Sequence, residues 1–104
     1  MSEKGVTFIN VFEIPADKVD AFIEQWKVRA KIMQDAPAVR DYRLHRAKLS
    51  DTKFQLVNVA HVDSVEAYEA AIARPAFQEA MGNVPSFVNA SWALYDVVAE
   101  YDRP

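Results

Sequence analysis

Apolar residues recur along the chain with two different spacings. Side chains alternate between two faces over residues 6–14, 39–48, 53–62 and 91–101, which predicts strands. Between Pro15 and Pro37 the apolar residues return at helical spacing, and a second, shorter helix is expected after Ser64. Arg74-Pro75 ends that helix, and residues 76–81 are predicted to form one further short helix. The order of the main elements is therefore β-α-β-β-α-β.

This order is typical of the ferredoxin-like fold, an α+β arrangement in which an antiparallel sheet carries its helices on one face. With 104 residues, the chain is long enough for one core, and we expect a single domain over 1–104. The strands are apolar on both faces, whereas the helices cover only one. Soluble monomers rarely expose such a patch. We therefore expect a homodimer that packs sheet against sheet and encloses a pocket in the resulting barrel.

Composition and charge narrow the range of partners. The chain is 51% hydrophobic and 26% charged with a net charge of −3, and no basic stripe indicates a nucleic-acid partner. It contains no cysteine, which excludes disulfides and thiolate chemistry. No apolar run approaches the roughly 20 residues of a membrane span. The expectation is a cytoplasmic protein without a membrane or nucleic-acid partner.

Two asparagines lie inside otherwise apolar strands, Asn10 between Phe8 and Phe12, and Asn58 in the run Leu56-Val57-Asn58-Val59-Ala60. A buried amide without a partner costs roughly 1–3 kcal/mol. The first and third strands are neighbours in the predicted sheet, so the two amides are expected to lie close together. Neutral amides suit contacts to a phenol or enolate oxygen in a dry pocket. The alternative is that each amide simply hydrogen-bonds the other.

The remaining candidate groups are the two histidines. By alternation His61 falls on the face opposite Asn58, where we expect it to face the helices or a strand end. His45 is assigned to the pocket wall as a group able to titrate near neutral pH, with a solvent-exposed strand histidine as the alternative. Two histidines without carboxylates at ligand spacing predict no metal site. Phosphate-binding and hydrolase motifs are also absent.

Several segments together resemble the antibiotic biosynthesis monooxygenase family. They are Val6-Thr7-Phe8-Ile9-Asn10-Val11-Phe12-Glu13-Ile14-Pro15-Ala16, Arg43-Leu44-His45-Arg46, Phe54-Gln55-Leu56-Val57-Asn58-Val59-Ala60 and Arg74-Pro75-Ala76-Phe77. The resemblance implies a homodimeric α+β barrel. It also implies an oxidoreductase that adds oxygen from O2 to a small aromatic or polyketide-type substrate, such as an anthrone or quinol, with no metal, flavin or other cofactor.

The resemblance further implies roles for individual residues. Asn10 matches an asparagine on the first strand of the family, and Asn58 matches the first residue of an Asn-x-x-x-Trp pattern, so both are candidate catalytic residues. Val62 stands where that pattern has tryptophan; with Phe8 and Phe12 it is assigned to the wall of the substrate pocket.

Two alternative functions remain open. In a haem-degrading branch of the family a tryptophan and a histidine are expected where this chain has Ala71 and Met81, which leaves iron without an evident axial ligand. The other alternative is a non-catalytic dimer that binds a small aromatic molecule.

Overall fold

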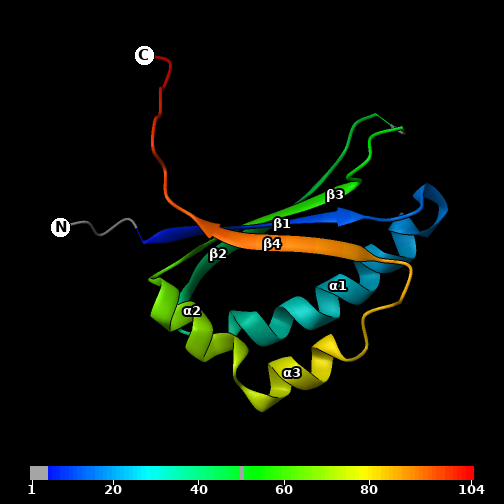
Figure 1. The fold of residues 1–104 in the computed structure, drawn as a ribbon, viewed down its shortest axis with the longest axis horizontal. Coiled ribbons are helices and arrows are strands. Elements are labelled where there is room, and N and C mark those ends of the chain that lie inside the picture. The colour runs from blue at the N-terminus through cyan, green and yellow to red at the C-terminus, as the bar shows by residue number, and fades with distance from the viewer. Residues whose placement is uncertain (1–4, 50) are drawn as a thin grey trace.

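A computed structural model describes residues 5–49 and 51–104 of the chain. One antiparallel sheet is built from four strands in the order β2-β3-β1-β4, as Figure 1 shows. The strands are β1 (Val6–Glu13), β2 (Val39–Arg46), β3 (Leu56–Val62) and β4 (Asn89–Tyr95). The predicted ferredoxin-like arrangement is confirmed.

The helices all lie on one side of this sheet (Figure 1). They are the 3-10 turn η1 (Ala16–Lys18), α1 (Val19–Gln34), α2 (Val65–Ile72) and α3 (Pro75–Met81). Ser64 caps α2, because its hydroxyl accepts a hydrogen bond of 3.0 Å from the amide of Ala67. Pro75 occupies the start of α3, where its missing N–H costs nothing. No helix of the described residues is long and apolar enough to cross a membrane.

The core fills the layer between sheet and helices in two clusters. The first surrounds Phe22 of α1, which is 1% exposed, and contains Phe12, Ile14, Val19 and Leu56. The second joins strand residues to α2 and contains Phe8, Ala60, Val62 and Tyr68. Apolar burial of this kind contributes most of the stability of a small domain.

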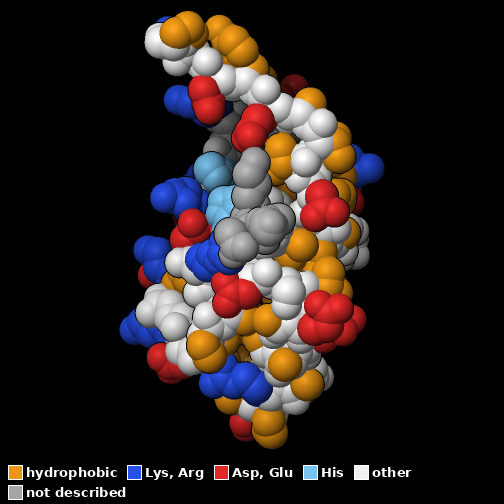
Figure 2. Space-filling view, turned by 90° about the vertical axis from the view of Figure 1, so that its left-hand side faces the viewer, with side chains coloured by type: hydrophobic (Ala, Val, Ile, Leu, Met, Phe, Trp, Pro, Cys, Tyr) orange, Lys and Arg blue, Asp and Glu red, His pale blue; other side chains and the backbone are white. Residues whose placement is uncertain are grey.

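All four strands are shorter than their sequence patterns predict, and the differences are largest for β3 and β4. β4 ends at Tyr95 rather than at residue 101, because Tyr95 already pairs with Thr7, close to the first residue of β1. Beyond Val6 the described residues contain no further strand residue of β1 with which β4 could pair. Residues 96–104 instead leave the sheet and stand out from the body of the molecule (Figures 1 and 2). β3 begins at Leu56 rather than at residue 53. Leu56 pairs with Arg46, which is the last residue of β2.

Candidate active site

Strand register brings three functional side chains into one row across the sheet. Asn10 of β1 lies directly opposite Asn58 of β3 on one side and opposite Trp92 of β4 on the other. Directly opposed residues of antiparallel strands hold their Cβ atoms about 4.5–5.5 Å apart and point to the same face. The two amides are thus neighbours, with an indole beside them.

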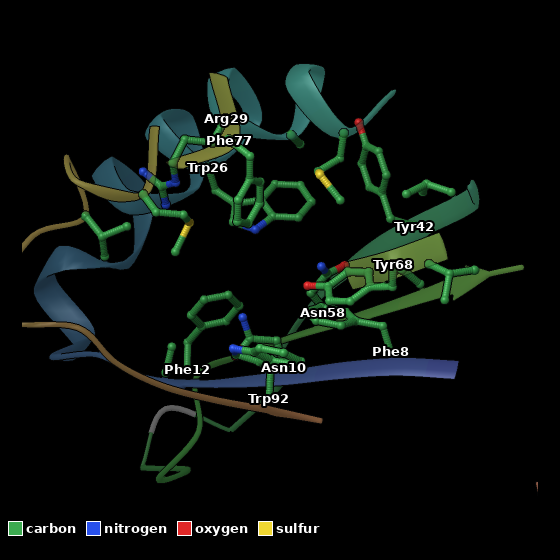
Figure 3. Close-up of a pocket in the computed structure, with 18 residues that line it drawn as sticks. Phe8, Asn10, Phe12, Trp26, Arg29, Tyr42, Asn58, Tyr68, Phe77 and Trp92 are labelled. Carbon is green, nitrogen blue, oxygen red and sulfur yellow. The ribbon is translucent and has the colours of Figure 1, made fainter. Parts of the chain in front are cut away.

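This row forms part of the wall of a cavity of about 290 Å³ between the sheet and the helices of the same chain. Figure 3 shows the sheet residues on one side of the space and helix residues on the other. Phe8, Phe12 and Val62 also line it. The expected location in a barrel between two sheets is therefore wrong. The physical reason is that Asn10 and its same-face neighbours point toward the helices, so the cavity forms within one chain.

The two amides have no hydrogen-bond partner among the described residues. The side-chain oxygens of Asn10 and Asn58 are both buried and unpaired, so the alternative in which each amide satisfies the other is not what the structure shows. Leaving a buried polar atom unpaired costs about 1–3 kcal/mol. Such groups in a cavity are available to a ligand or to water.

Aromatic rings pack around the amides on one side of the cavity. The ring of Tyr68 lies 5.1 Å from that of Phe8 and 5.5 Å from that of Trp92, and Phe8 and Trp92 are 5.6 Å apart. Figure 3 shows the Tyr68 hydroxyl directed toward the amides. Burial raises the pKa of Tyr68 to about 12, so its phenol stays protonated at neutral pH and serves as a donor.

The side of the cavity opposite the amides carries a second aromatic pair, one ring from α1 and one from β2, and a cation. Trp26 and Tyr42 meet edge to face with ring centroids 5.4 Å apart, and the Gln34 amide bonds the Tyr42 hydroxyl. Phe77 of α3 and Arg29 of α1 complete this side (Figure 3). The cavity is therefore mainly apolar, with a few polar groups at separate places, as is typical of small-molecule sites.

The two histidines lie on the other face of the sheet. His61 pairs with Thr7 and Asp41 in the register, so it points away from the helices. Of its two expected places, the one facing the helices is wrong, whereas His61 does lie at a strand end, as the second-last residue of β3. Its Nδ1 lies 2.8 Å from Asp41 Oδ1, and this hydrogen bond is the main reason that the pKa of Asp41 is lowered. His45 is exposed on that same face and does not line the cavity, so its assignment to the pocket wall is not supported.

Sequence reasoning missed several residues of this site. Trp92 alternates onto the same face as Leu94, but only the β1–β4 register places it beside Asn10. Trp26 lies on the apolar stripe of the first helix, and only the structure shows that it lines the cavity. Arg29 lies seven residues after Phe22, hence two helical turns along the apolar stripe, and that spacing was a usable signal.

Comparison with known proteins supports the resemblance. The sequence profile described as antibiotic biosynthesis monooxygenase matches residues 5–83. The chain belongs to this family. A candidate monooxygenase from Shewanella loihica PV-4 is 32% identical, with a TM-score of 0.81, and the match covers 91% of this chain and 95% of that one. A search of curated proteins found no match.

Other solved members of the fold differ in chemistry. SnoaB, a cofactor-independent oxygenase from Streptomyces nogalater, is 22% identical with a TM-score of 0.75, covering 94% of this chain and 97% of SnoaB. MhuD from Mycobacterium tuberculosis, a heme-degrader whose structure holds two hemes in its active site, is 24% identical with a TM-score of 0.71, covering 93% and 99%. At these identities the likeness concerns the fold, so the choice between reactions depends on the site itself.

Proposed function

We propose that this family member is a cofactor-independent monooxygenase that acts on a small aromatic, anthrone- or quinol-like substrate with O2. The observation that carries the proposal is the pair of amides, Asn10 and Asn58, side by side in an otherwise apolar cavity, whose buried, unpaired oxygens can accept from a substrate hydroxyl and whose N–H groups can donate to its anion. An apolar cavity removes water from an aromatic ring, while the amide groups offer hydrogen bonds to its oxygen.

In the proposed reaction the substrate itself supplies the electrons. Loss of a proton gives an enolate or phenolate whose negative oxygen accepts hydrogen bonds from the amide nitrogens of Asn10 and Asn58. The carbanion form of this anion then reduces dioxygen. One oxygen atom becomes the new carbonyl oxygen of a quinone-type product, and the other leaves as water. The protein contributes desolvation, orientation and stabilisation of the oxyanion.

The residues that line the cavity determine which protein groups could accept the proton that the substrate loses. Among the described residues, no carboxylate and no histidine line the cavity, and the Tyr68 phenol, with its pKa of about 12, does not accept protons at neutral pH. We therefore expect the pH dependence of kcat/KM to follow the acidity of the substrate rather than that of a protein group. Changing the substituents on the substrate should move the profile.

We also propose that the protein works as a cytoplasmic homodimer. On the helix-free face of the sheet, Ile9, Val11, Val57 and Val59 form an apolar band that is only half-buried. The same face of a second copy of the chain would bury this band away from water. The cavity, however, lies on the other side of the sheet, so it does not depend on a sheet-to-sheet barrel.

Oxygen uptake with an anthrone is the direct test. The expected result is enzyme-dependent consumption of O2 with equimolar quinone formation, unchanged after extensive treatment with a metal chelator. Binding of the anthrone without oxygen uptake above the uncatalysed rate would instead favour the non-catalytic binding protein. Haem turnover receives less support from the site, because no histidine of the described part of the chain lines the cavity.

A further inference from the structure

Arg29 is the charged side chain among the described residues that line the cavity. It projects from α1, so it belongs to the helix side, whereas Asn10 and Asn58 belong to the sheet. Figure 3 shows this guanidinium at the edge of the space, across from β1. A charge at such a place either is incidental to packing or recognises part of a ligand.

The guanidinium has no carboxylate partner within the described part of the chain. Its carbon lies 5.1 Å from the ring centroid of Phe22, a side chain that is only 1% exposed. This cation–π contact holds the group in place while leaving its N–H donors free. Burial alone lowers the pKa of Arg29, without any contribution from a nearby charge.

Two other cations on or near the same helix are paired with carboxylates. Lys27 pairs with Glu24 at 3.2 Å, and Arg46 pairs with Asp20 of α1 at 2.8 Å. Arg29 is thus a partly desolvated cation whose missing partner must come from outside the described residues. An arginine fork is suited to bidentate binding of a carboxylate.

We propose that the cavity takes an aromatic acid, whose carboxylate binds Arg29 and whose phenolic or enolic oxygen lies between Asn10 and Asn58. The carboxylate and the oxygen of such a molecule match the guanidinium on the helix side and the amides on the sheet side, and its ring lies among the apolar residues that line the cavity. The contact to the amides rests on the proposed function, while the contact to Arg29 does not.

A matched pair of ligands tests this specificity. The probes are 6-hydroxy-2-naphthoate and 6-hydroxy-2-naphthamide, which differ only in the charge at one end, and their affinities are measured by isothermal titration calorimetry. We expect the wild-type protein to bind the acid roughly 10-fold more tightly, the low end for a charge-assisted hydrogen bond because Arg29 is partly exposed. Arg29→Met should remove this preference, and Arg29→Lys should keep part of it.

The control variant is Lys31→Met, which removes the same charge from an exposed position of α1 that does not line the cavity. It should leave the preference unchanged. Equal affinity of the wild type for the two probes, failure of the acid to bind, or an unchanged preference in Arg29→Met overturns the proposal. The wild-type comparison decides even if Arg29→Met does not fold.

The outcome is separable from that of the proposed function. Charge preference is measured by binding, without turnover. A protein that prefers the acid but consumes no oxygen contradicts only the oxygenase, whereas an active oxygenase indifferent to the carboxylate contradicts only the role of Arg29.

Discussion

Replacing Asn10 or Asn58 by leucine is expected to stabilise the protein while abolishing its activity. Leucine has nearly the shape of asparagine but no polar atoms. Each asparagine now buries an unpaired amide oxygen, and removing that atom should raise the free energy of unfolding by about 1–3 kcal/mol. For a domain of this size each 1 kcal/mol corresponds to roughly 4–8 °C in Tm. If the two asparagines are catalytic, replacing them should stabilise the protein, because residues kept for activity often lower stability.

Activity should move in the opposite direction. If the amides stabilise a developing enolate, losing either donor should lower kcat by roughly 10²-fold or more. Because both amides serve one charge, the double variant should be less impaired than the product of the two single effects. The assays are oxygen consumption with an anthrone and thermal unfolding, on wild type, Asn10→Leu, Asn58→Leu and the double variant.

Asn89→Leu provides the matched control, since this asparagine is an exposed strand residue that does not line the cavity. It should change neither Tm nor turnover appreciably. The reasoning is refuted if Asn10→Leu and Asn58→Leu keep full activity and lose stability, because the amides would then be architectural. A loss of activity together with a loss of fold would be recognised by the thermal scan and by circular dichroism.

Three further predictions concern the rest of the molecule. Sedimentation at micromolar concentration should show a dimer that Val59→Arg, on the helix-free face, converts to a monomer; a stable wild-type monomer would contradict the proposed interface. Hemin should produce no stoichiometric Soret shift, and the Soret band should not be lost when a reductant is added under air. Either change would favour the haem-degrading alternative over the proposed oxygenase. The hydrogen bond from His61 lowers the pKa of Asp41 in the folded protein. The contribution of this hydrogen bond to the stability of the protein is therefore fully present above the ordinary aspartate pKa, and it is lost as the pH falls through the lowered pKa of Asp41. Asp41→Asn should therefore reduce stability at neutral pH by roughly 0–1 kcal/mol, as both partners are partly exposed, and weaken the acid dependence of Tm; equal pH profiles would rule this out.

Alternation and helical spacing were enough to predict the order of elements and the neighbourhood of the two asparagines. Period-two alternation assigns Asn10 to the same face as Phe8 and Phe12, and the fold class makes β1 and β3 adjacent. These are local properties of the backbone, so they can be read without knowing what packs against what. The family resemblance rested on the same segments and was confirmed by the profile match.

Which face of the sheet receives the helices was decided only by the tertiary structure. β1 is apolar on both faces, so its pattern does not distinguish the side of Asn10 from the side of Ile9. For that reason the cavity was expected between two sheets, which is wrong, and His61 lies at the end of β3 rather than toward the helices. Trp92 comes to lie beside Asn10, and Arg29 comes to line the same cavity, only through register and packing between segments far apart in the chain. Such contacts depend on long-range geometry, which no local spacing encodes.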